Sequence, residues 1–74
     1  MIDKTEIRRN YHDQAIILTL AKDKEAMAGM IVDDRPADYC IFVKTPNLVE
    51  YYETKEESLF ERVHFEDITA IDYQ

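Results

Sequence analysis

The two histidines are the first candidates for chemistry, because imidazole is the commonest metal ligand among protein side chains. His12 and His64 lie near opposite ends of the sequence, so the fold would have to assemble any site they share. Asp13, Glu66 or Asp67 would complete such a ligand set, but no short-spaced metal motif links these positions. We therefore expect hydrogen-bonding or solvated histidines and no metal site.

The carboxylates occur as adjacent pairs, a spacing that does not suit acid–base catalysis. Neighbouring residues on a strand point to opposite faces, so adjacent carboxylates do not converge on a substrate. Ser58 is the only serine and lacks the flanking glycines of a nucleophile elbow. Phosphate loops, CxxC motifs and dinucleotide fingerprints are also absent. The adjacent carboxylate pairs mentioned above are Asp33/Asp34, Glu56/Glu57 and Glu66/Asp67. Taken together, these observations lead us to expect a non-enzymatic protein without a cofactor.

The length of the chain and its cysteine content limit the fold. Its 74 residues make one domain, 1–74, and the hydrophobic fraction of 46% is enough for a core. Cys40 is the only cysteine, so an intrachain disulfide is excluded. Because Cys40 lies in the apolar run 39–43, we expect a packed core thiol rather than a reactive one.

The net charge of −7 restricts the classes of partner. A field of that sign repels phosphate backbones and anionic membrane surfaces, and it attracts basic proteins. The alternative interpretation is that the charge serves solubility alone. No apolar stretch approaches the roughly 20 residues of a membrane span, and Met1–Lys4 lacks the apolar core of a signal peptide. We expect a cytoplasmic protein that does not bind membranes.

The chain begins with a predicted short helix over residues 3–10. Asp3 is suited to cap it, and Glu6 lies three residues further on, as a capping box requires. Ile7 and Tyr11 are four residues apart and share a face. A helix this short is not stable alone, so that face must dock on the rest of the protein.

The remaining sequence predicts short β-strands separated by brief polar turns, one of them at 22–25. Gly29 lies inside the second predicted strand and indicates a sharp bend or a bulge. We expect a mainly β fold, with five or six antiparallel strands in a strongly bent sheet that forms a small SH3-like or Sm-like barrel. The predicted strands are 15–21, 26–32, 39–44, 48–53, 59–65 and 69–73.

This order of elements resembles the Sm-like small β-barrel superfamily, with a YolD-like or Hfq-like outline. Gly29, Ile31 and the acidic turn at Asp33 and Asp34 are similar to the second strand of an Sm protein. The closing run Val63–Tyr73 is similar to the turn into the last strand of YolD-like barrels. The resemblance implies a barrel and, in Sm proteins, an RNA pocket.

The chain departs from the Sm pattern where that pocket would lie. The resemblance implies an Asn in the turn after the second strand and a basic–Gly pair before the last strand. Here Asp38–Tyr39 and Glu66–Asp67 occupy those regions. Acidic residues at these turns favour a protein partner over RNA.

The fourth and fifth predicted strands form a hairpin that is both aromatic and acidic. One of the two tyrosines at 51 and 52 must face away from the core if the hairpin alternates. An exposed aromatic side chain among glutamates suits a basic protein surface, whereas core or oligomer packing is the alternative explanation. The candidate partner-binding residues are Glu50, Tyr52, Glu53, Glu56, Glu57 and Phe60.

Two functional classes follow from the sequence. The first is a small regulatory or adaptor domain that binds a protein partner through this acidic, aromatic surface. The alternative is an Sm-like nucleic-acid-binding oligomer, which would use the basic positions Arg8–Arg9, Lys22 and Lys24. In either class, edge strands of an incompletely closed barrel would allow homo-oligomers.

Overall fold

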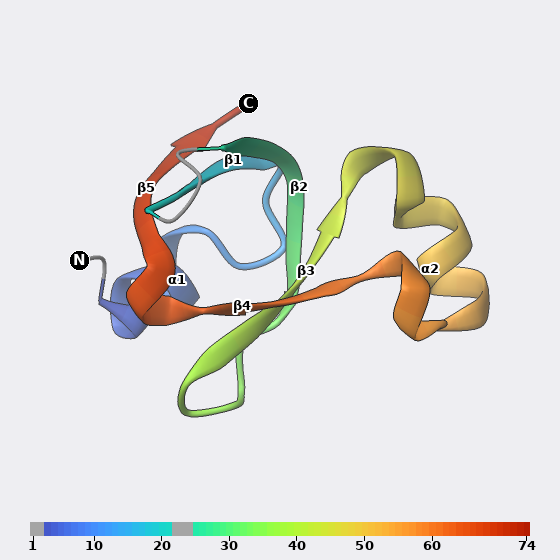
Figure 1. Cartoon of the computed structure of the whole chain (residues 1–74), viewed down its shortest axis with the longest axis horizontal. Helices are drawn as coiled ribbons and strands as arrows, with labels where there is room; N and C mark the ends of the chain where they lie inside the picture. Colours follow the sequence, from blue (N-terminus) through green and yellow to red (C-terminus); the bar gives the residue numbers. More distant parts are fainter. Residues whose placement is uncertain (1–2, 22–24) are drawn as a thin grey trace.

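The protein is mainly β, with five strands in one antiparallel sheet and a short helix before them (Figure 1). The computed structural model describes residues 3–21 and 25–74, and the turn predicted at 22–25 falls mostly outside them. The helices are α1 (Lys4–Asn10) and α2 (Leu48–Thr54), with single 3-10 turns at η1 (Thr45–Asn47), η2 (Glu57–Leu59) and η3 (Phe65–Asp67). The strands are β1 (Ile16–Leu20), β2 (Ala26–Asp33), β3 (Tyr39–Lys44), β4 (Glu61–His64) and β5 (Ile68–Tyr73).

The strands are ordered β4-β3-β2-β1-β5, so β4 and β5 are the two edges of the sheet. The η3 turn separates them, and Figure 1 shows them diverging from it: β4 pairs with β3, whereas β5 crosses over to β1. Among the described residues the sheet is not closed between β4 and β5. The predicted mainly β fold and helix are confirmed, but a closed barrel is not formed.

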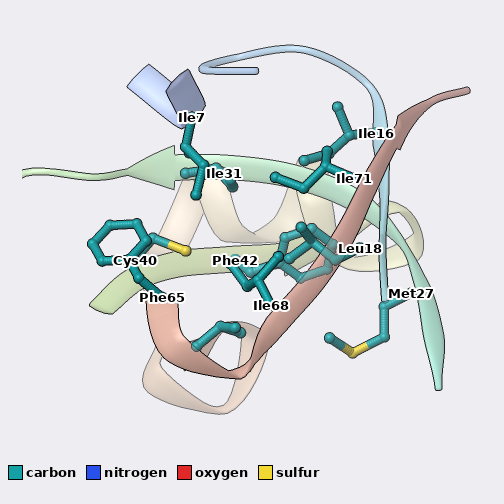
Figure 2. Close-up of a cluster of buried hydrophobic side chains, with 11 residues drawn as sticks. Ile7, Ile16, Leu18, Met27, Ile31, Cys40, Phe42, Phe65, Ile68 and Ile71 are labelled. Atoms are coloured by element: carbon teal, nitrogen blue, oxygen red, sulfur yellow. The ribbon is translucent and has the colours of Figure 1, made fainter. Parts of the chain in front are cut away.

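One face of the sheet carries the core, as the alternation of apolar residues predicts. Inward-facing side chains from all five strands meet Ile7 of α1 and the buried Phe65 of η3 (Figure 2). Tyr11 is half-buried and packs against this cluster, which confirms that the Ile7/Tyr11 face docks. Cys40 is a buried free thiol, as predicted. The core cluster comprises Ile7, Ile16, Leu18, Met27, Ile31, Cys40, Phe42, Val63, Phe65, Ile68 and Ile71.

The predicted cap of α1 is formed. The side chain of Asp3 accepts a hydrogen bond from the backbone N–H of Thr5 at 3.1 Å. At the other end, the backbone N–H of Tyr11 donates to the carbonyl of Ile7 at 3.0 Å. Because both ends are satisfied, seven residues hold a helical conformation once Ile7 is buried.

The bulge that Gly29 was predicted to mark does not lie at this residue. Gly29 pairs with Ile16 and Lys44 without a register shift, and the bulge in β2 lies between Ile31 and Asp33. A Cβ atom at Gly29 would overlap the carbonyl oxygen of Val43 and lie 2.8 Å from Cζ of Phe42. Glycine is therefore required because β3 approaches the backbone of β2 closely, and not because of a bulge.

The strand predicted at 48–53 is wrong, because this segment is the helix α2. Valine and two tyrosines favour a strand only weakly. Relative to alanine, each destabilises a helix by only about 0.5 kcal/mol. Pro46, which was predicted to be a turn residue, lies in the first turn of the helical segment, at η1. The strand predicted at 59–65 is shorter, since η2 occupies its start and β4 covers only Glu61–His64.

Candidate functional site

The connection between β3 and β4, residues 45–60, is the least embedded part of the described chain, and we name it the α2 arm. It contains η1, α2 and η2. The structure describes every residue of this segment, and none of them is buried. Figure 1 shows it extending to one side of the sheet, away from α1 and from both termini. The arm therefore presents side chains that the core does not use.

The helix of the arm is stabilised by local hydrogen bonds. The hydroxyl of Thr54 donates to the carbonyl of Glu50 at 3.0 Å. Lys55 adopts the left-handed conformation, with φ 58°, and its N–H donates to the carbonyl of Tyr51 at 2.8 Å. This backbone conformation ends the helix and returns the chain toward β4.

Val49 and Tyr52 form the exposed apolar side of the arm. They are three residues apart on α2 and so lie on the same side of the helix. Val49 is 75% exposed and Tyr52 is 51% exposed. Tyr73 on β5 is also exposed, but a group of exposed apolar side chains with a polar rim is what marks a candidate contact surface, and Val49 and Tyr52 form such a group.

Three aromatic rings of the arm pack edge to face, and we name them the aromatic cluster: Tyr51, Tyr52 and Phe60. The ring centroids of Tyr51 and Tyr52 are 5.5 Å apart with an interplanar angle of 69°. Those of Tyr51 and Phe60 are 5.8 Å apart at 86°. Edge-to-face pairs at these distances are mutually attractive, so the rings form a defined surface.

Two cations of the chain lie against this cluster. The ammonium of Lys55 lies 4.7 Å from the ring centroid of Tyr51 and 4.8 Å from that of Tyr52. The guanidinium carbon of Arg62 lies 5.4 Å from the ring centroid of Phe60. All three separations are within the range of a cation–π contact. Arg62 also approaches a carboxylate oxygen of Glu57 at 3.9 Å.

The six predicted partner-binding residues all belong to the arm. Tyr52 and the four glutamates are exposed, whereas Phe60 is half-buried beneath Tyr51. Four glutamates and one lysine give residues 45–60 a formal charge of −3, out of −7 for the chain. The glutamates are Glu50, Glu53, Glu56 and Glu57. The sequence analysis did not predict that Lys55 and Arg62 lie against the aromatic rings of this segment.

A cluster of polar side chains connects α1 to the turn after β2, and the sequence analysis did not predict it. Asp34 is 7% exposed. Arg8 donates from Nη2 and Nε to the carbonyl of Asp34 at 2.7 and 3.1 Å. His12 places Nδ1 3.1 Å from a carboxylate oxygen of Asp34 and Nε2 3.0 Å from one of Asp13. These contacts join the helix to the sheet.

Neither histidine belongs to a metal centre in the described part of the chain. No group of three or more histidine, cysteine, aspartate or glutamate side chains there is arranged to hold a metal ion. His64 is exposed on β4, and its ring lies 6.1 Å from that of Tyr39. His12 instead lies between the two carboxylates of Asp13 and Asp34.

The thiol of Cys40 is not a nucleophile in the folded protein. Burial, with a smaller contribution from the nearby negative charge of Asp34, raises its pKa to about 12. A thiol in this state is almost entirely protonated at neutral pH, whereas a thiolate is the reactive form.

A surface cavity of about 650 Å³ lies beside α1, which Figure 1 shows at the other end of the molecule from α2. It is formed by the start of α1, the loop before β3 and the η3 turn, and Phe65 forms part of its wall. Its lining residues are Asp3, Lys4, Ala37, Asp38, His64, Phe65 and Glu66. Both acidic and basic side chains therefore line the cavity.

Comparison with known proteins gives no relative from which a function can be transferred. No family model, curated protein or solved structure matches the chain. Within the described residues, no helix has both the length and the apolar character needed to cross a membrane. The fold itself defines a small antiparallel β-sheet domain with a projecting helical arm.

Proposed function

We propose that this protein is a non-enzymatic adaptor or regulatory domain that binds a basic surface of a protein partner through the α2 arm. One observation carries the proposal: Val49 and Tyr52 are exposed on one side of α2, and glutamates surround them. An apolar centre with a charged rim is the usual composition of a protein interface. A negative rim increases the rate of encounter with a positive surface.

The alternative function, nucleic-acid binding by an Sm-like oligomer, has less support. Of its proposed basic positions, Arg8 already donates to the carbonyls of Asp34 and Arg35. Lys22 and Lys24 lie outside the described residues. A chain of charge −7 would need such positions to offset its repulsion of phosphates.

Photo-crosslinking tests the proposed surface directly. A photoreactive amino acid replaces Val49 in the native host, and a second variant carries it at Thr5, which is exposed on α1. Mass spectrometry identifies the captured protein, which is then purified. We expect capture from position 49 and not from position 5.

Calorimetry with the purified partner then measures the contribution of the acidic rim. Glu53→Lys with Glu56→Lys should weaken binding at least about tenfold, because two attractive charges become repulsive. The matched control, Asp38→Lys with Glu66→Lys, makes the same change in net charge at the cavity on the other side and should change affinity less than about twofold.

Two results would contradict the proposal. Equal losses of affinity in the arm variant and in the control would show that only net charge matters. Tight binding of an oligonucleotide at low salt, unaffected by the arm variant, would instead support the alternative function.

A further inference from the structure

We propose that the aromatic cluster is a cation-binding cage, and that it receives a lysine or arginine side chain from a basic segment of the partner. In the free protein, Lys55 occupies this cage. The inference rests on the proposed function and specifies its ligand. It is carried by the geometry of the three rings and of the two cations that they already hold.

The rings of Tyr51 and Tyr52 define two walls of the cage. They meet at 69°, and the ammonium of Lys55 is almost equidistant from their centroids, at 4.7 and 4.8 Å. A single cation thus contacts two π faces at once. This is the arrangement by which aromatic cages hold ammonium groups, because each ring presents the negative face of its quadrupole.

Phe60 extends the same surface. Its ring stands at 86° to that of Tyr51, and Arg62 lies over it at 5.4 Å. The cluster therefore already binds one ammonium and one guanidinium from its own chain. Lysine and arginine side chains are therefore both suited to bind this surface, whereas an anion is not.

The glutamates of the arm add a long-range attraction for the same ligand. Glu50, Glu53 and Glu56 are exposed beside the cage, and the segment 45–60 keeps a charge of −3 even with Lys55 counted. Carboxylates of this number attract a multiply charged basic segment and would repel an acidic one. Charge complementarity therefore selects a lysine- or arginine-rich segment as the occupant.

Lys55 can leave the cage without unfolding the arm. Its backbone N–H ends α2 by donating to Tyr51, and this bond does not involve the side chain. The side chain is exposed, and cation–π contacts at exposed sites are weak. A cation from a partner can therefore replace the ammonium, so Lys55 competes with the ligand.

Tetramethylammonium is the probe for the cage, since it carries a positive charge but cannot donate a hydrogen bond. Its binding is followed by the NMR shifts of the tyrosine ring protons, with sodium chloride at equal ionic strength as the reference. We expect the rings of Tyr51 and Tyr52 to respond and those of Tyr11 and Tyr73, which pack on one another at 5.1 Å elsewhere, to remain unchanged.

Variants separate displacement of Lys55 from a simple effect of charge. Lys55→Gln empties the cage and should increase the affinity for tetramethylammonium at least about threefold, because the internal competitor is lost. Lys4→Gln removes the same charge from α1 and should leave the affinity unchanged. Tyr52→Leu should abolish the response, and its far-ultraviolet circular dichroism checks that the arm is folded.

The inference fails if the tyrosine rings do not respond to tetramethylammonium, or if Lys55→Gln and Lys4→Gln raise the affinity equally. It also fails if Lys55→Gln lowers the affinity. These outcomes differ from failure of the proposed function: the cage can be absent while charge reversal on the arm still releases the partner. Conversely, a partner that crosslinks elsewhere overturns the proposed function even if the cage binds the probe.

Discussion

His12 and Asp34 approach to 3.1 Å between Nδ1 and a carboxylate oxygen, at the point where the turn after α1 meets the turn after β2. Both atoms are buried, and neither makes a hydrogen bond, with the other or with a third group, in the described part of the chain. Arg8 supports the same junction by donating twice to the carbonyl of Asp34. Polar contacts therefore hold α1 against the rest of the protein, in addition to the burial of Ile7 in the core.

The first prediction concerns this junction. Arg8→Ala should lower the free energy of unfolding by about 1–2 kcal/mol, because hydrogen bonds from a charged donor to Asp34 are lost. Urea denaturation at pH 7 measures the change. Arg9→Ala is the matched control, since Arg9 is the exposed neighbour in the same helical turn and should change stability by less than about 0.5 kcal/mol. Equal effects at the two positions would contradict the role of Arg8.

The second prediction concerns the close approach of β2 and β3. Gly29→Ala should lower the free energy of unfolding by about 2–3 kcal/mol, because the added methyl group overlaps the backbone of β3. Ala28→Ser, on the exposed face one residue earlier, should cost less than about 0.5 kcal/mol. Thermal or urea unfolding compares the two variants. Wild-type stability in Gly29→Ala would show that β3 can shift without cost.

The sheet was largely predictable because apolar residues alternate along much of β1, β2 and β3. Ile16 and Leu18 in β1, and Cys40 with Phe42 in β3, point inward at every second position, as burial on one face requires. The helix α2 was not predictable in the same way. Its tyrosines and valine favour strands locally, but 16 residues at 45–60 form the connection between β3 and β4 and pair with no strand.

The candidate site was predictable in composition but not in geometry. The glutamates and Tyr52 are exposed although the strand predicted for them is a helix, so their exposure was predicted from an incorrect local structure. The placement of Lys55 over two rings depends on a left-handed residue at the end of α2, which is not apparent from alternation. Contacts between residues far apart in the chain, such as Arg8 with Asp34, carry no local signal at all.

The third prediction concerns the reactivity of Cys40. A pKa of about 12 leaves about one thiol in ten thousand ionised at pH 8, compared with about a quarter for an unperturbed cysteine. Alkylation by iodoacetamide under native conditions should therefore be slower than in urea by at least about a hundredfold. Mass spectrometry over time measures both rates. Comparable rates in the folded and unfolded chain would show that the thiol is accessible and ionised.

The last prediction concerns the acid sensitivity of the turn after β2. Hydrogen bonds from the side chain and the backbone N–H of Arg35 lower the pKa of Asp33. Because the folded pKa lies below the unfolded value, near 3.9, the Asp33 carboxylate stabilises the fold above that value. This contribution is lost as the pH falls through the folded pKa. At pH 7 we expect Asp33→Asn to cost about 0.5–1 kcal/mol, a modest value because Arg35 is largely exposed and screened by solvent.

Urea unfolding of the wild type and of Asp33→Asn, from pH 7 down to pH 2.5, tests this sign. The two stabilities should converge at acidic pH, because a protonated Asp33 no longer differs from asparagine in charge. Arg35→Gln is the matched variant: it removes the ion pair but keeps the backbone N–H at position 35 that donates to Asp33 at 3.0 Å. It should therefore lose less stability at pH 7 than a variant lacking both contacts, Asp33→Ala. A difference between wild type and Asp33→Asn that stays constant with pH would show that the Asp33 charge does not stabilise the turn.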